Sequence, residues 1–180
     1  MKKTLIIQTS PMHTASTLLV NALYGLFPFL RDKRIVGFWE PEWWNEFNSD
    51  IIVLKSHNLD IDWFKKHFGL HYKLIFICSE RKDKNLFINE KYKDLENVIC
   101  FDYFELNETK KNTLPNIVQI IQEKIKQKFP NLELNSKTSL QRILAMNEEY
   151  EQIKEKPFSF VNEFYHIHGS HRNRPNSLTQ

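Results

Sequence analysis

Glycine is the residue whose scarcity says most about this sequence. Only four of its 180 residues are glycine, and residues 8–17, which join the first apolar run to the first helical pattern, contain neither glycine nor lysine. The nucleoside-triphosphate loop of pattern G-x-x-x-x-G-K-[ST] needs both, because its glycines let the backbone cradle the phosphates and its lysine pairs with them. That loop, and the lysine-dependent ATP chemistry that it supports, are therefore disfavoured here.

Cysteine, long apolar runs and strong net charge are scarce as well. The two cysteines, Cys78 and Cys100, each end an apolar run, where free thiols pack as small hydrophobic residues, so we expect reduced thiols and a cytoplasmic protein. Too few apolar residues follow the basic start for a secretory leader, and no run reaches the roughly 20 apolar residues of a membrane span. A net charge of +3 does not indicate nucleic acid, and we expect neither a nucleic acid nor a membrane as a partner.

What the sequence does contain is a strand, a tight loop and a helix within residues 4–25. Leu5, Ile6 and Ile7 form a short apolar run, Pro11 breaks it, and apolar residues return at helical spacing from Leu18 onward. A strand that enters a helix through a loop of small and hydroxylated residues leaves backbone N–H groups and the positive end of the helix dipole at one point. That point suits a phosphate, although the same segment is also compatible with plain scaffolding.

Strands and helices alternate along the rest of the chain. We expect strands at 34–39, 50–54, 73–78 and 97–103, and helices at 60–68, 114–129 and 139–154. This alternation predicts one α/β domain with a mainly parallel central sheet flanked by helices, to which we assign residues 1–174, followed by a flexible tail at 175–180. The aromatic cluster after the second strand either lines an acceptor pocket or covers the core; its members are Trp39, Trp43, Trp44 and Phe47.

Polar and basic residues follow two of these strands directly. Lys55 and His57 come after strand 50–54, and Ser79 and Arg81 come after strand 73–78. In open parallel sheets ligands bind at the carboxyl ends of the strands, so these residues are candidates for a binding site. Because side chains alternate along an extended chain, Lys55 and His57 lie on the same side and can face one site. The alternative is that they are solvated strand ends.

These places resemble the sulfotransferases that use 3′-phosphoadenosine 5′-phosphosulfate (PAPS), which have a P-loop-like fold. Residues 11–18 align with the family's loop P-[KR]-S-G-[ST]-T-x-L, with Met12 at its basic position and Thr14 at its glycine. Residues 55–57, Lys-Ser-His, are similar to the family's K-T-H motif at a strand end. Residues 73–83 are similar to its strand followed by C-R-N-x-x-D, which holds the 3′-phosphate, with Ser79 at the arginine position and Arg81 two residues later.

The resemblance implies an enzyme that moves a sulfuryl group from PAPS to a hydroxyl of a small molecule or glycan and releases 3′-phosphoadenosine 5′-phosphate (PAP). His57, with an ordinary pKa of about 6.5, would be the general base, and Lys55 would stabilise the leaving phosphate. Two alternatives stay open: a non-catalytic module that binds PAP or another nucleotide on the same fold, and a diverged relative of the nucleotide kinases. The nucleotide contacts that the resemblance implies are Met12, His13, Thr14, Ala15, Ser16, Thr17, Ser79 and Arg81.

The C-terminal segment is basic and rich in histidine. We expect His171, Arg172 and Arg174 to reach the nucleotide, because Ser79 leaves the 3′-phosphate without its usual arginine and a guanidinium pairs with phosphate bidentately. His166, His168 and His171 could instead be metal ligands. No cysteine or carboxylate cluster accompanies them in the sequence, so we expect no metal site.

Overall fold

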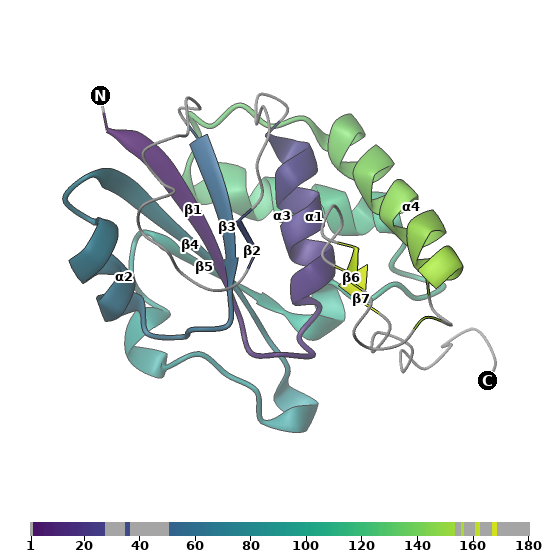
Figure 1. The fold of residues 1–180 in the computed structure, drawn as a ribbon, viewed down its shortest axis with the longest axis horizontal. Coiled ribbons are helices and arrows are strands. Elements are labelled where there is room, and N and C mark those ends of the chain that lie inside the picture. The colour runs from purple at the N-terminus through teal and green to yellow at the C-terminus, as the bar shows by residue number, and fades with distance from the viewer. Residues whose placement is uncertain are drawn as a thin grey trace.

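The computed structural model of the chain describes residues 2–27, 35–36, 51–153, 156, 161–162 and 167–168. Within them a five-stranded sheet has the order β2-β3-β1-β4-β5, and every neighbouring pair of strands is parallel (Figure 1). The strands are β1 (Lys3–Thr9), β2 (Ile35–Val36), β3 (Ile51–Ser56), β4 (Tyr72–Glu80) and β5 (Val98–Asp102).

Helices cover both faces of the sheet. Figure 1 shows α2 (Ile61–Phe68) on one face, and α1 (Ser16–Leu26), α3 (Leu114–Lys128) and α4 (Ser136–Ile153) on the other. Two short antiparallel strands, β6 (Val161–Asn162) and β7 (Ile167–His168), form a separate pair beside α4. This architecture confirms the predicted α/β fold, with a parallel sheet flanked by helices.

Successive side chains of each strand point to opposite faces of the sheet, and this produces two hydrophobic cores. Ile6, Val53 and Ile75 pack in the core beneath α1, α3 and α4, and their neighbours in sequence, such as Ile7 and Phe76, pack in the core beneath α2. Central strands that are buried on both faces need near-continuous apolar sequence, and the sequence of these strands has that pattern.

Gly25 lies inside α1 and lets this helix pack closely on α4. A Cβ at this position would lie 2.4 Å from the Cα of Ser139, a distance that no real contact allows. Close packing on α4, and not helix termination, therefore requires this glycine, and α1 ends at the next residue, Leu26. The Ser139 hydroxyl also donates to the carbonyl of Ala22 at 2.9 Å.

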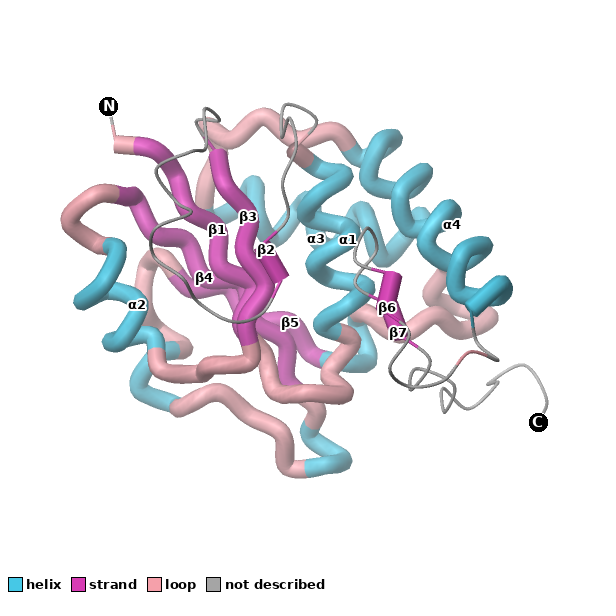
Figure 2. The backbone as a smooth tube through the Cα atoms, viewed as in Figure 1, coloured by secondary structure: helices cyan, strands magenta, loops and turns pink. Residues whose placement is uncertain are grey.

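The order of the strands creates a point at which the chain changes direction across the sheet. After β1 the chain continues to β2 and β3 on one side, and after β3 it returns to β4 on the other side of β1. Figure 2 shows that the loops after β1, β3 and β4 leave at the same edge of the sheet. In open α/β sheets ligands bind at such a switch point, outside the carboxyl ends of the strands.

Two strands extend further than the sequence pattern indicated. β3 continues through Lys55 and Ser56, and β4 continues through Ser79 and Glu80, so these side chains belong to the buried sheet and not to an exposed rim. Both cysteines are free thiols, as expected. In the described part of the chain no helix combines the length and apolar character needed to cross a membrane.

Several predicted features lie outside the described residues. They are the aromatic cluster of Trp39, Trp43, Trp44 and Phe47, the tail residues His171, Arg172 and Arg174, and residues 175–180.

Candidate functional site

The loop between β1 and α1 has an alternating backbone that glycine usually provides. His13 has φ 68° and Ala15 has φ 63°, while Thr14 between them has no positive φ. Left-handed conformations cost a non-glycine residue roughly 1–2 kcal/mol each, so this loop stores strain. Where left-handed residues alternate with right-handed ones, successive backbone N–H groups turn toward one point, and such concavities at helix N-termini commonly hold anions.

A buried layer of hydroxyl groups supports this loop from below. Ser10, Thr14 and Ser79 are fully buried. The Ser10 hydroxyl accepts a hydrogen bond from the backbone N–H of Ser79 at 2.8 Å, and the Thr14 and Ser79 hydroxyls lie 2.9 Å apart. Thr14 also donates to the carbonyl of Pro11 at 2.7 Å. The hydroxyls of Thr14 and Ser79, which the resemblance assigned to nucleotide contact, therefore hold the loop in position.

Lys55 is the most unusual residue of the site. Its side chain is only 8% exposed, and its Nζ donates to the hydroxyl of Thr17 in the first turn of α1 at 3.0 Å. No carboxylate among the described residues lies within ion-pair distance of this ammonium group. Burial lowers the pKa of Lys55 from its ordinary 10.5 to about 8, so the group is mostly charged at pH 7.

A buried ammonium with no carboxylate partner in the described part of the chain is unusual, because buried charges in proteins are normally paired. Lys55 lies on β3, next to the strand that leads into the loop, and its hydrogen bond brings its charge to the N-terminus of α1. The helix terminus and the ammonium are both positive. Two positive groups at one point create a local potential that favours an anion.

His57 follows β3 and is exposed to solvent. Its Nδ1 lies 2.7 Å from the carbonyl oxygen of Ser10, and because a carbonyl only accepts, Nδ1 carries the proton in the neutral ring. Nε2 is then the basic atom, as in sites where a hydrogen bond fixes the tautomer. Partial removal of the ring from water lowers the pKa of His57, the Ser10 carbonyl opposes this, and the nearby charges of Lys55 and His13 lower the pKa further.

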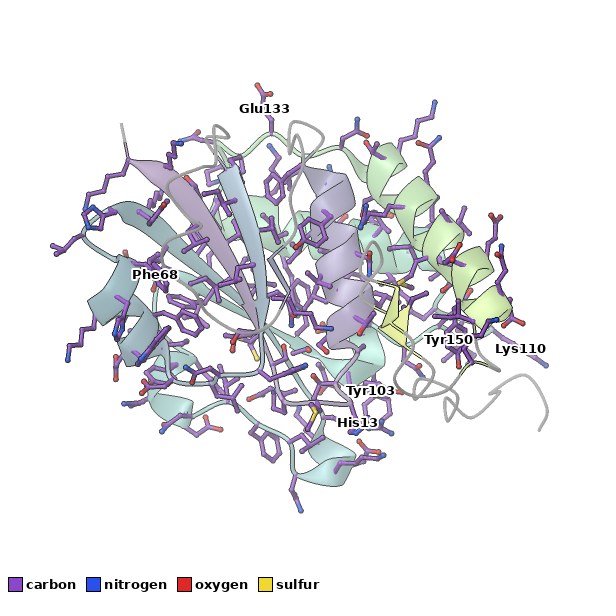
Figure 3. All side chains as sticks on the ribbon, in the orientation of Figure 1. His13, Phe68, Tyr103, Lys110, Glu133 and Tyr150 are labelled. Carbon is purple, nitrogen blue, oxygen red and sulfur yellow. The ribbon has the colours of Figure 1, made fainter. Side chains whose placement is uncertain are left out.

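Arg81 connects the loop to the rim of the neighbouring strands. Its guanidinium donates to Asp83 at 2.9 Å and to the carbonyl of His13 at 3.4 Å, and it lies 4.0 Å from the ring centroid of Tyr103. Figure 3 shows His13 and Tyr103 at the same rim. Arg81 is therefore within reach of the loop, as the sequence predicted, but part of its hydrogen-bonding capacity is taken by Asp83.

The remaining loop residues differ in their exposure. The side chain of Met12 is 63% exposed and His13 is exposed, whereas Ser16 and Thr17 are buried at the start of α1. Sequence reasoning missed the supporting role of Ser10 and the partners of Arg81, which are Asp83 and Tyr103. Only the position of Ser10 directly after β1 could have signalled its role.

Among the residues that the structure describes, no group of three or more histidine, cysteine, aspartate or glutamate side chains gathers as a metal site would. The sequence also raised a metal site in the histidine-rich tail. Of that tail the structure describes only Ile167 and the backbone of His168.

Comparisons with protein-family models, with curated proteins and with solved structures found no match to this chain. The site brings together a strained loop with left-handed residues, a buried ammonium group, a histidine with a defined basic nitrogen and an arginine, all at one edge of a parallel sheet.

Proposed function

We propose that this chain binds PAPS at the edge formed by residues 10–17, Lys55, His57 and Arg81, and transfers its sulfuryl group to a hydroxyl acceptor. The observation that carries the proposal is the buried ammonium of Lys55, which has a hydroxyl partner and no carboxylate partner in the described chain. A phosphate or sulfate at the start of α1 supplies the missing counter-charge.

Each side chain has a definite task in this transfer. Nε2 of His57 takes the proton of the acceptor hydroxyl as the acceptor oxygen forms its bond to sulfur. The bond between sulfur and the bridging oxygen breaks, and that oxygen keeps the electron pair on the departing PAP. Lys55 and the backbone N–H groups of the loop stabilise the negative charge that develops there. Arg81 is the described residue best placed to pair with the 3′-phosphate, in exchange for its bonds to Asp83.

A second candidate function is binding without transfer. Met12 stands where the resemblance has a basic residue, and its 63% exposed thioether brings no charge to the transferring group. A module that binds PAP and performs no chemistry uses the same loop and the same lysine. The difference between the two functions therefore depends on whether Lys55 alone provides enough positive charge.

The ligand preference tests the binding half of the proposal. We expect PAP to raise the thermal unfolding temperature more than 5′-AMP or ADP, because the loop and Lys55 hold one phosphate and Arg81 holds the second. A ligand at a hundredfold excess over its dissociation constant stabilises a protein by about 2.7 kcal/mol, which differential scanning fluorimetry resolves. Equal or greater stabilisation by ATP with Mg²⁺ contradicts the proposal and favours a kinase relative.

A further inference from the structure

The turn between α2 and β4 presents an exposed leucine at the edge opposite the candidate site. Leu70 is 78% exposed, the highest value for a large hydrophobic side chain among the described residues. The turn is tightly closed: Gly69 donates to the carbonyl of Lys65 at 3.0 Å, and His71 donates to that of Phe68 at 3.0 Å. A Cβ on Gly69 would lie 2.5 Å from the Lys65 carbonyl oxygen, so the glycine is required here. Leu70 is thus held outward by a defined backbone.

Several basic residues belong to the elements that meet at this turn. Lys65, Lys66 and His67 occupy the last turn of α2, and the Nζ of Lys2 donates to the carbonyl of Gly69 at 3.1 Å, which brings the start of β1 to the same turn. Residues 61–73 contain one acidic side chain, Asp62, which lies in the first turn of α2 and is 2.7 Å from Lys91. We name this surface the basic turn patch; it consists of Lys2, Lys65, Lys66, His67, Leu70, His71 and Lys73.

Helix stability explains only part of this patch. Cations at the C-terminus of a helix interact favourably with its dipole, which accounts for Lys65, Lys66 and His67. It does not account for the exposed leucine, for Lys2, or for Lys73, which lies on the next strand and is exposed. An exposed apolar side chain with several basic residues nearby can combine apolar burial with electrostatic attraction to anionic lipids.

We propose that the basic turn patch docks the protein on an anionic phospholipid bilayer, with Leu70 inserted among the lipids and the lysines on the headgroups. This replaces our expectation that a membrane is not a partner. A nucleic acid would pair with the lysines but offers nothing to an exposed leucine at the tip, so lipid fits the patch better. Parallel strands separate the two ends of the sheet, so the docked protein keeps the loop after β1 open to solvent (Figure 2).

Vesicle sedimentation with the full chain tests this proposal. We expect binding to vesicles of phosphatidylcholine with about 30% phosphatidylserine, weak binding to phosphatidylcholine alone, and loss of binding as salt is raised. Lys65→Gln with Lys66→Gln should weaken binding about 25-fold, because each lysine near an anionic surface contributes about fivefold. Leu70→Ser should weaken it at least roughly tenfold, because the apolar side chain no longer enters the bilayer.

The control is Lys110→Gln with Lys111→Gln, which removes the same charge from exposed lysines elsewhere; Figure 3 shows Lys110 at the end of the molecule away from α2. This pair should leave binding almost unchanged. Circular dichroism checks that every variant is folded. Three results would each overturn the proposal. They are equal binding to both vesicle types, an equal loss of vesicle binding in the two lysine double variants, and unchanged vesicle binding by Leu70→Ser. Retention of single-stranded RNA by the wild type and Leu70→Ser alike, without vesicle binding, assigns the patch to nucleic acid instead.

Discussion

Replacement of Lys55 by methionine should stabilise the fold and abolish nucleotide binding in the same variant. Burial lowers the pKa of Lys55 from 10.5 to about 8, and at about 1.36 kcal/mol per pH unit the buried charge costs the folded state about 3 kcal/mol. Methionine has a similar length and no charge, so we expect a gain of about 1–3 kcal/mol in the free energy of unfolding at pH 7. Urea unfolding measures it.

The same variant should lose at least a hundredfold in affinity for PAP, because the anion loses its buried cation. Isothermal titration calorimetry measures this loss. Lys73→Met, which removes an exposed lysine from β4, is the matched control and should change neither stability nor affinity appreciably. A destabilised Lys55→Met protein that binds PAP normally would show that the ammonium group is structural.

The pH dependence of stability distinguishes this account from a general packing effect. A lysine whose folded pKa is lowered destabilises the protein fully below pH 8, and the penalty disappears as the pH rises from about 8 to 10.5. The contribution of Lys55 to wild-type stability therefore increases across that range, and the increase should be missing in Lys55→Met. Anion affinity has the opposite trend, because only the charged form binds, and should fall above pH 8.

Replacement of His57 by glutamine should remove sulfuryl transfer and leave PAP binding intact. The glutamine amide can still donate to the Ser10 carbonyl, but it has no basic nitrogen, so we expect the transfer rate to fall by roughly 10²–10⁴. The dissociation constant of PAP should change less than about threefold, because His57 acts on the acceptor. Rates of PAP release from PAPS, together with calorimetry, give the two values.

The control for this variant is His71→Gln, which alters an exposed histidine at the opposite edge of the sheet and should transfer at the wild-type rate. The pKa of His57 is lowered below 6.5, so the imidazole is mostly neutral at pH 7. With increasing pH, the wild-type transfer rate should therefore rise in the range below pH 6.5 and then stay level. It should fall again near pH 8, where Lys55 loses its proton. An undiminished rate in His57→Gln would require another base, and His13 in the loop is the next candidate.

The sheet and its helices could be predicted because strands that are buried on both faces of the sheet require continuous runs of apolar residues. The strands that contain Ile6, Val53 and Phe76 are continuous apolar runs between polar turns. The ends of the strands could not be predicted as well, because Ser79 and Glu80 are polar and yet are buried in β4. Their burial depends on partners that are distant in sequence, such as the Ser10 hydroxyl, and a local hydrophobicity pattern does not reveal such contacts.

The site was predictable at the level of which residues meet, but not of what each one does. Lys55, His57 and Arg81 are next to the loop, as their positions after parallel strands indicated. The lack of a carboxylate partner for Lys55 among the described residues, and the tautomer of His57, depend on distances that no spacing encodes. Neither could the sequence show that His13 and Ala15 adopt the left-handed backbone normally left to glycine.

The release of PAP from PAPS is the measurement that tests the central claim most directly. Purified protein is incubated with PAPS and a mixture of phenols, alcohols and carbohydrates, and PAP is quantified by ion-exchange chromatography against a Lys55→Met blank. We predict acceptor-dependent release of PAP by the wild type well above the blank. Tight binding of PAP with no release above the blank would contradict transfer and leave a binding module.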